Sequence, residues 1–282
     1  MTSSIPPGAY AMVIGAMKSG TSSLFDLLTQ HPAICASTAK EPEFFSETQG
    51  HRVEVERYED LFPFDPATHA VCLEASTGYT KYPEEVGVPD RIAAYGLHPR
   101  FIYIVRDPVD RIVSQHNFAR MNDFAWGGET LGEGFALDVS RYHLQLSQFL
   151  EVFPDRSRYR VVDFEDLKRA PADLAASLFA WLGLEPFAVD VAPPRNATQA
   201  RSEAELALVR SPLHKLRHLL PPSVREGLKS VLRSRGTPAT HEPTEAERAE
   251  LQAALHDDML RFEEVFGFPV ETWGFRRDPS AV

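Results

Sequence analysis

Short apolar runs, each followed by small or polar residues, recur along the first two thirds of the chain. They cover residues 11–15, 70–75, 101–105 and 159–163. The third run reads FIYIV and is the most strand-like, because it is short, apolar and rich in β-branched and aromatic side chains. We therefore predict a strand at each of these four places.

Helical patterns follow the first, third and fourth of these runs. The first helix covers about residues 20–30 and ends before Pro32, since proline disfavours a helical residue ahead of it. Asp107 and Pro108 fit the cap and the first position of a second helix. A third helix is predicted at 171–182. Strands that alternate with helices predict an α/β fold with a parallel sheet, whose ligands bind where the strands end.

The last third of the chain has a different composition. Between residues 193 and 243, prolines and many basic residues interrupt apolar helical patches, which favours a loop-rich lid. A final helix is predicted at about 244–266, with an apolar face, and Gly267 ends it. We expect one domain over residues 1–282, with its core at about 8–190 and the lid and C-terminal helix at about 191–276.

The segment between the first strand and the first helix, GAMKSGTSS at residues 15–23, indicates an anion site. A glycine-rich turn that leads into a helix points backbone N–H groups at one spot. Gly15 and Gly20 have the separation found in G-x-x-x-x-G-K-[ST] loops, but no lysine follows Gly20. Lys18 stands inside the turn instead, where a point charge reaches the bridging oxygen of an anhydride. An ordinary glycine turn capped by Ser or Thr is the alternative.

Charge and composition narrow the function classes. A formal net charge of −11 argues against a general nucleic-acid binder, which needs a basic stripe. No apolar run approaches the 18 residues of a membrane span, and no basic segment precedes the first apolar stretch, so we expect no signal peptide. Cys35 and Cys72 have no metal-ligand spacing and form no disulfide framework. We therefore expect a cytoplasmic protein.

Three segments in this order point to one family. They are GAMKSGTSSL at 15–24, KEPEFF at 40–45 and IVRDPVDRIVSQ at 104–115. Together they closely resemble the sulfotransferases that use 3′-phosphoadenosine 5′-phosphosulfate (PAPS), in the branch with the heparan sulfate sulfotransferase domains and their bacterial relatives. The resemblance extends from about Tyr10 to Trp273. It implies the phosphate-loop sulfotransferase fold, with a helical C-terminal lid.

The resemblance also implies positions for the donor. The residues that match the loop for the 5′-phosphosulfate are Lys18, Ser19, Gly20, Thr21 and Ser22, and Ser23 adds a further hydroxyl. Arg106 and Ser114 match the pair that clamps the 3′-phosphate. Arg111 either adds to this clamp or forms an ion pair with Asp107. In the late loop that closes over the nucleotide, the candidates are Arg235 and Gly236, with Arg233 as a rival.

The second segment implies the catalytic base. Glu41 matches the base of the family, and Glu43 is a fallback because side chains two residues apart in an extended segment point the same way. The alternative is a charged loop that Phe44 and Phe45 anchor in the core. Histidine is the base in another branch, but His116 lies on a helix and faces away from Ser114.

One departure concerns the acceptor. In the animal heparan sulfate sulfotransferases of this family, a lysine often follows soon after the glutamate of the strand that corresponds to residues 70–75. Here Ala75 and Ser76 follow Glu74 instead. We therefore expect recognition of the acceptor to differ.

These residues predict in-line transfer of a sulfuryl group from PAPS to a hydroxyl or amine of a small-molecule, glycolipid or carbohydrate acceptor. Glu41 would take the proton, Lys18 would stabilise the transferred group, and no metal is expected. A phosphate-loop kinase of nucleosides or small molecules is the first alternative, but it needs a lysine after Gly20 and a carboxylate for magnesium. The second is a nucleotide-binding protein without catalysis.

Overall fold

A parallel sheet forms the centre of the structure, a computed structural model that describes residues 5–48, 54–122, 131–191 and 240–277. The strands in the described part of the chain are β1 (Tyr10–Gly15), β2 (Ile34–Ala36), β3 (Val71–Ala75), β4 (Arg100–Val105) and β5 (Tyr159–Asp163). Their order is β2-β3-β1-β4-β5, and every neighbouring pair is parallel. All four predicted strands are confirmed. The short strand β2 was not predicted, because three residues carry too little pattern.

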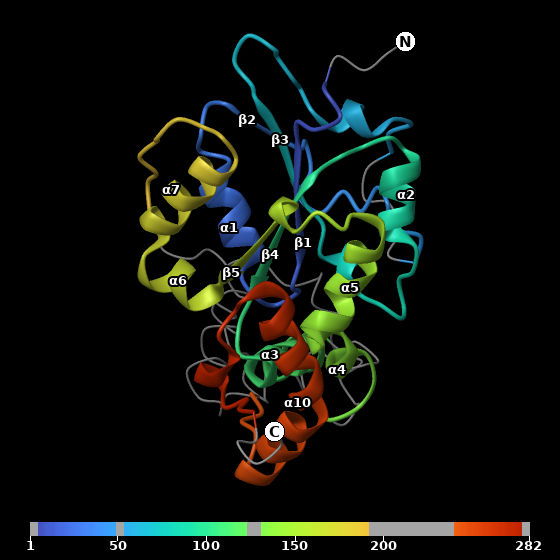
Figure 1. Cartoon of the computed structure of the whole chain (residues 1–282), viewed down its shortest axis with the longest axis vertical. Helices are drawn as coiled ribbons and strands as arrows, with labels where there is room; N and C mark the ends of the chain where they lie inside the picture. Colours follow the sequence, from blue (N-terminus) through green and yellow to red (C-terminus); the bar gives the residue numbers. More distant parts are fainter. Residues whose placement is uncertain (1–4, 49–53, 123–130, 192–239, 278–282) are drawn as a thin grey trace, which may run out of the picture.

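Helices cover both faces of this sheet (Figure 1). They are α1 (Thr21–Leu28), α2 (Val88–Ala94), α3 (Pro108–Asn122), α4 (Gly134–Ser140), α5 (Tyr142–Val152), α6 (Phe164–Arg169), α7 (Pro171–Trp181) and α10 (Glu245–Phe266). Single turns of 3₁₀ helix connect them: η1 (Tyr58–Leu61), η2 (Thr77–Thr80), η4 (Arg156–Arg158) and η6 (Val270–Trp273). Helices α1, α6 and α7 lie on one side and α2 and α5 on the other, while α3, α4 and α10 gather where the strands end (Figure 1).

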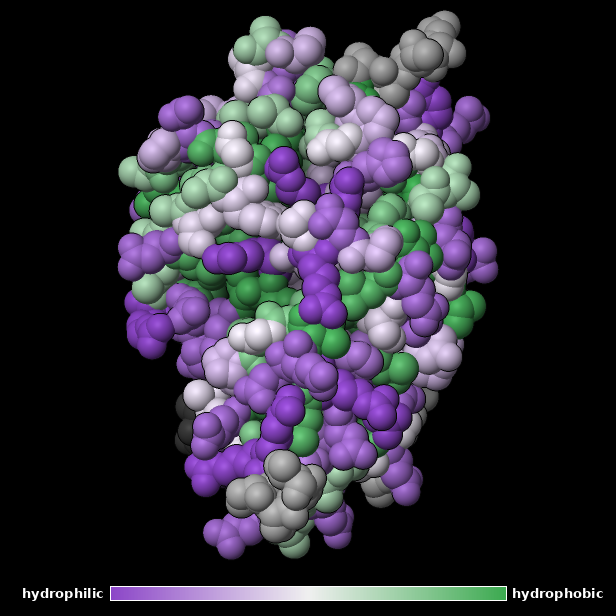
Figure 2. All heavy atoms as spheres, viewed as in Figure 1, coloured by the Kyte–Doolittle hydropathy of each residue, from purple (hydrophilic) through white to green (hydrophobic). Residues whose placement is uncertain are grey.

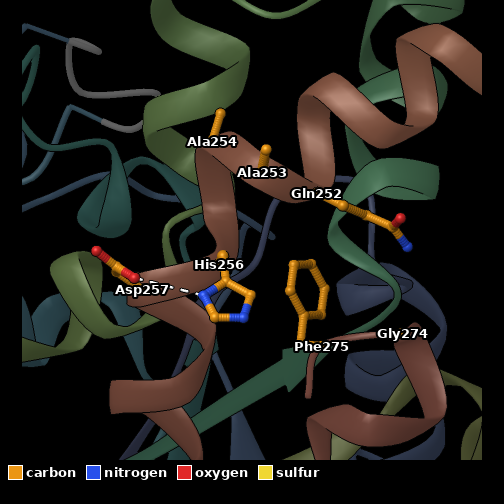
Figure 3. Close-up of a pocket in the computed structure, with 7 residues that line it drawn as sticks. All are labelled: Gln252, Ala253, Ala254, His256, Asp257, Gly274 and Phe275. Atoms are coloured by element: carbon orange, nitrogen blue, oxygen red, sulfur yellow. Dashed lines mark hydrogen bonds and ion pairs between the residues drawn. The ribbon is translucent and has the colours of Figure 1, made fainter. Parts of the chain in front are cut away.

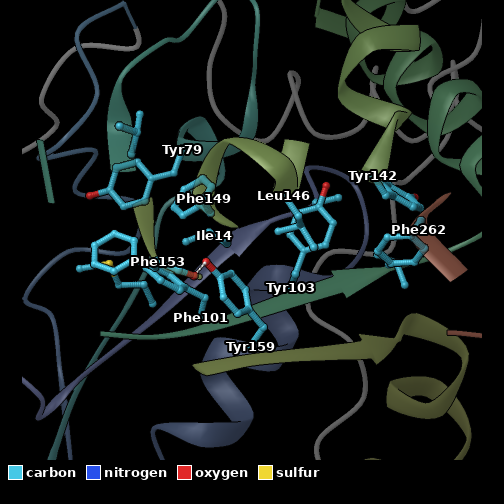
Figure 4. Close-up of a cluster of buried hydrophobic side chains, with 14 of the residues drawn as sticks. Ile14, Tyr79, Phe101, Tyr103, Tyr142, Leu146, Phe149, Phe153, Tyr159 and Phe262 are labelled. Atoms are coloured by element: carbon cyan, nitrogen blue, oxygen red, sulfur yellow. Dashed lines mark hydrogen bonds between the residues drawn. The ribbon is translucent and has the colours of Figure 1, made fainter. Parts of the chain in front are cut away.

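Two apolar layers flank the sheet because successive side chains of a strand point to opposite faces. From β1, Met12 and Ile14 enter the layer under α2 and α5, whereas Ala11 and Val13 enter the layer under α1 and α7. Aromatic rings fill much of the first layer (Figure 4). The ring of Phe101, for example, lies 5.2 Å from those of Phe149, Phe153 and Tyr159. This packing fixes the positions of the strand ends.

The C-terminal helix α10 closes the end of the molecule where the strands finish. A capping box between Thr244 and Glu247 starts the helix, and Gly267 ends it with a φ of 67°. Buried side chains line its inner face: Leu251, Leu255, Met259 and Phe262. Hydrophilic side chains cover the outer face that Figure 2 shows over α10. Among the residues described, no helix is long and apolar enough to cross a membrane.

Candidate functional site

The loop between β1 and α1 is bent around two glycines that have no space for a side chain. Gly20 has a φ of 88°, and a Cβ there would lie 2.7 Å from the ring of Phe164. At Gly15 a Cβ would overlap Thr80 Oγ1 and the ring of Tyr103. The structure therefore confirms the predicted strand, glycine turn and helix, and the start of α1 offers the unpaired N–H groups of a helix N-terminus.

Lys18 lies within this turn in the left-handed conformation, with a φ of 69°. Its ammonium is 4.0 Å from the centroid of the Phe118 ring on α3. Burial lowers the pKa of Lys18, and the positive charges of Arg106 and Arg111 lower it further. The loop therefore holds a partly desolvated cation beside two guanidinium groups. Phe118 was not singled out from the sequence, where one aromatic residue in a helix carries no special signal.

Arg106 brings the end of β4 to this loop. Its Nη1 donates to the carbonyl oxygen of Lys18 at 3.5 Å, and its guanidinium lies 5.1 Å from the centroid of the Phe164 ring. Its Nη2 is 3.9 Å from a carboxylate oxygen of Asp110. Ser114 is half-buried on α3, one turn after Asp110. Arg106 and Lys18, which are 88 positions apart in the chain, thus lie side by side.

Arg111 braces the loop from inside the protein. Its fully buried guanidinium donates to Ser140 Oγ at 2.6 Å, to Gln115 Oε1 at 2.7 Å, and to the carbonyl oxygens of Ala136 at 2.6 Å and Met17 at 3.3 Å. Burial lowers the pKa of Arg111 to about 10. The group supports the loop and is not exposed to a phosphate. In the sequence, only the short distance from Arg106 indicated that Arg111 belongs to this region.

The expected ion pair between Arg111 and Asp107 is wrong. Asp107 caps α3 by accepting from the N–H groups of Val109 at 2.8 Å and Asp110 at 3.2 Å. Its ion-pair partner is Arg248 of α10, which lies 3.3 Å from Asp107 and 2.7 Å from Asp110. Sequence reasoning could not find this partner because it is more than 130 positions away.

The KEPEFF segment bends sharply and is not extended. Glu41 has a φ of 57° and Glu43 a φ of 53°, both in the left-handed region that most residues avoid. Glu41 forms an ion pair with Lys40 at 2.7 Å and keeps 19% of its side chain exposed. The assumption that Glu41 and Glu43 point the same way along an extended segment therefore fails.

Glu43 is fully buried and is held by two hydrogen bonds, so it is a poor candidate for a base that meets an acceptor. Its carboxylate accepts from Gly78 N–H at 2.9 Å and from Ser46 Oγ at 2.7 Å. Burial raises the pKa of Glu43, while these hydrogen bonds and the charge of Lys81 oppose the rise. Lys81 is buried, seven residues after Glu74. Its positive charge acts on Glu43 and lowers the pKa of that carboxyl group.

The other predicted residues fall outside the site or outside the described residues. His116 packs against His241, with ring centroids 5.7 Å apart, and burial lowers its pKa. Arg233, Arg235 and Gly236 lie outside the described residues. A base role for His116 therefore gains no support from its surroundings.

A hollow of about 420 Å³ lies on α10 and the segment after η6 (Figure 3). Its lining residues are Gln252, Ala253, Ala254, His256, Asp257, Gly274 and Phe275. His256 already contacts the Arg276 carbonyl oxygen at 3.0 Å and Asp257 at 3.4 Å. None of these residues belongs to the three motifs, so the hollow is separate from the candidate site.

The strand ends form an anion-binding arrangement with room for more hydrogen bonds. The Oγ of Ser19 is buried and has no hydrogen-bond partner among the described residues. Such an orphaned hydroxyl fits a bound anion, because buried polar groups are normally paired. Lys18 and Arg106 add two positive charges, and Glu41 lies in the segment that follows β2. These groups can bind a phosphate-like anion, and the carboxylate of Glu41 keeps 19% of its side chain exposed.

The sequence is similar to those of known sulfotransferases. A model of the Sulfotransferase family matches residues 11–188. The chain is 27% identical over 191 residues to human heparan sulfate glucosamine 3-O-sulfotransferase 5, which covers 62% of this chain and 54% of that protein. It is 26% identical over 202 residues to the bifunctional heparan sulfate N-deacetylase/N-sulfotransferase 1 of Caenorhabditis briggsae, over 62% of this chain and 23% of that protein. The chain thus spans about half the length, or less, of these relatives.

A solved structure has the same fold. The sulfotransferase from Alicyclobacillus acidocaldarius matches 96% of this chain and 100% of its own, with a TM-score of 0.62 and 22% identity. The family match covers more than half of the 282 residues, and it begins within β1 and ends after α7. The chain belongs to the sulfotransferase family and is a transferase enzyme.

Proposed function

We propose that this enzyme moves a sulfuryl group from PAPS to a hydroxyl or amine of a carbohydrate or small-molecule acceptor. PAPS supplies the activated sulfuryl group. Residues 18–23 would hold its 5′-phosphosulfate, while Arg106 and Ser114 would hold its 3′-phosphate. The observation that supports this proposal most directly is the hydrogen bond from Arg106 Nη1 to the Lys18 carbonyl oxygen. It brings the proposed 3′-phosphate site next to the proposed 5′-phosphosulfate loop.

Lys18 and Glu41 would carry out the chemistry. The ammonium of Lys18 would stabilise negative charge that develops on the transferred group and on the leaving phosphate, a kind of contribution typically worth about 10²–10³ in rate. Glu41 would take the proton of the acceptor, which typically contributes about 10²–10⁴. Its carboxylate lies 2.7 Å from the ammonium of Lys40, which would be close to the proton transfer.

Two measurements test the donor and the base separately. Binding of adenosine 3′,5′-bisphosphate is compared with binding of ATP, and transfer of labelled sulfate from PAPS is followed with a panel of hydroxyl and amine acceptors. We expect the bisphosphate to bind more tightly than ATP, and Glu41→Gln to lose about 10²–10⁴ of transfer while it keeps bisphosphate affinity.

Tighter binding of ATP, with phosphoryl transfer that requires magnesium, would support a kinase instead. Full transfer by Glu41→Gln would remove Glu41 as the base but leave the donor assignment intact. Glu43→Gln is an informative companion variant, because the Glu43 carboxylate is fully buried and bonded to Gly78 and Ser46. A larger loss in Glu43→Gln than in Glu41→Gln would contradict our choice of base.

A further inference from the structure

The bend that presents Glu41 needs support from elsewhere in the fold. Glu41 and Glu43 both have positive φ values, which cost free energy for residues with a side chain. Such conformations persist only where the surroundings fix them. The atoms that fix this bend therefore influence where the Glu41 carboxylate lies.

Two hydroxyl groups hold the backbone of the bend. Ser76 Oγ, just after β3, accepts a hydrogen bond from the Glu43 N–H at 3.0 Å. Tyr79 Oη, in η2, accepts from the Phe45 N–H at 3.4 Å. Each of these oxygens can accept only if its own hydrogen points away from the amide.

Glu74, the buried carboxylate near the end of β3, takes both of those hydrogens. Ser76 donates to Glu74 Oε2 at 2.6 Å, and Tyr79 donates to Glu74 Oε1 at 2.8 Å. Tyr58 donates to the same Oε1 at 3.0 Å, and it meets the bend through its ring, whose centroid lies 5.3 Å from that of Phe44 and 4.8 Å from that of Phe45, contacts that Tyr58→Phe keeps. The acceptor-only carboxylate thus orients two hydroxyls so that their lone pairs face the amides of Glu43 and Phe45.

We propose that Glu74 is a positioning residue for the transfer reaction: through Ser76 and Tyr79 it holds the backbone at Glu43–Phe45, and thereby the carboxylate of Glu41. The inference rests on the proposed role of Glu41 as base. It assigns a function to a fully buried carboxylate.

The arrangement requires Glu74 to be ionised. The groups that face it are Tyr58 from η1, Ser76, Tyr79 from η2, and Glu43 from the bend. A protonated Glu74 would have to donate to one of the hydroxyls and so disturb a hydrogen bond to the bend. Burial, with a smaller contribution from the negative charge of Glu43, raises the pKa of Glu74 to about 7, although the hydrogen bonds from Ser76, Tyr79 and Tyr58 act in the opposite direction. The hold on the bend therefore weakens as the pH falls through about 7.

The test compares variants that remove one hydroxyl each. Ser76→Ala and Tyr79→Phe lose a bond to the bend, whereas Tyr58→Phe loses only a bond to Glu74 Oε1. We expect Ser76→Ala to lower kcat about 10- to 100-fold, since small misplacements of a reacting group have effects of this size. Donor KM and bisphosphate affinity should stay within about twofold, because the donor grip does not include the bend. Tyr58→Phe should lose clearly less, although Tyr58 donates to the same carboxylate.

Glu74→Gln supplies a second readout. An amide at this position does not titrate, so the decline of kcat below about pH 7 that Glu74 causes should disappear. Equal losses in Tyr58→Phe and Ser76→Ala, or an unchanged pH profile in Glu74→Gln, would overturn the inference. If a thermal melt shows that Glu74→Gln is not folded, the kcat values of Ser76→Ala, Tyr79→Phe and Tyr58→Phe still test the inference.

The outcome separates the inference from the proposed function. An inactive Glu41→Gln together with a fully active Ser76→Ala would leave Glu41 as the base and remove Glu74 as its positioning residue. An active Glu41→Gln would remove the base assignment itself.

Discussion

The ammonium of Lys18 lies over the ring of Phe118, 4.0 Å from its centroid. One group comes from the loop after β1 and the other from the third turn of α3. A cation held over an aromatic face gains about 0.5–2 kcal/mol, depending on its exposure. In the ligand-free protein this contact therefore holds the ammonium of Lys18 against the Phe118 ring and out of bulk water.

Removing the ring should change how tightly a phosphate competes for Lys18. In Phe118→Leu the ammonium loses its aromatic partner, so we expect adenosine 3′,5′-bisphosphate to bind about 2- to 10-fold more tightly, as the loss of about 0.5–1.4 kcal/mol requires. Calorimetry measures this change, and Phe118→Tyr, which keeps an aromatic face, should bind as the parent does. Weaker binding in Phe118→Leu would mean that the ring holds Lys18 in its ligand-binding position.

Arg111 should be a stability residue. Arg111→Leu leaves Ser140, Gln115 and two carbonyl oxygens without their shared donor, which we expect to cost about 2–4 kcal/mol of unfolding free energy. Bisphosphate affinity should fall as well, because the Met17 carbonyl of the loop loses its brace. Urea denaturation and calorimetry measure the two effects.

Arg141→Ala is the matched control for Arg111. This arginine makes a surface ion pair with Asp138 at 2.9 Å, and such pairs contribute less than about 1 kcal/mol. A similar loss of stability in both variants would show that the buried network has no special role.

Arg248 should affect the donor site from a distance. It neutralises Asp110, which also lies 3.9 Å from Arg106. In Arg248→Ala we expect Asp110 to attract Arg106 more strongly and the KM for the donor to rise several-fold, since charge pairs of this kind shift affinity by about 1 kcal/mol. Asp110→Asn in the same chain should restore the KM, and steady-state kinetics of the single and double variants measure this. A failure of that rescue would mean that Arg248 acts only by anchoring α10.

Stability and activity should respond to pH in opposite directions. The pKa of Glu74 rises from 4.5 to about 7 on folding, so the folded state binds this proton more readily than the unfolded state does. The protonated form therefore favours folding, and this contribution, about 3 kcal/mol, is lost as pH rises from about 4.5 to about 7. The transfer reaction needs the ionised form and should gain over the upper part of the same range.

Urea denaturation of the parent and of Glu74→Gln at pH 5 and pH 8 tests the stability part. The parent should lose stability relative to the variant between the two pH values. If the free energies of unfolding of the parent and of Glu74→Gln differ by the same amount at pH 5 and at pH 8, the prediction is contradicted. Other titrating groups affect both proteins equally and do not change this comparison.

The sequence predicts the sheet and the glycine turn after β1 well because their signals are local. Apolar runs identify four strands, and the glycines with Lys18 identify the loop after β1. The capping pattern at Asp107 and Pro108 places the start of α3 at its observed residue. These features depend on neighbours within a few positions.

Other parts of the site depend on contacts that no local pattern encodes. The left-handed bend at Glu41 and Glu43 reads as an extended segment, because the hydroxyls that hold it are more than 30 positions away. Lys81 is buried, and no pattern around it in the sequence indicates this. Arg248 pairs with Asp107 and Asp110 across 141 and 138 positions. Tertiary packing decides each of these.

The order of the strands has a consequence for how acceptor preference can diversify. The donor loop, Arg106 and Ser76 follow β1, β4 and β3, which are three adjacent strands of one rigid sheet. The segment between β2 and β3 contributes none of these groups, so it can change in length or composition without moving the donor loop or Arg106. We expect chimeras that exchange only residues 40–48 with a relative to change the acceptor while donor affinity stays the same. On this proposal, the donor groups stay in place while residues 40–48 adapt to different acceptors.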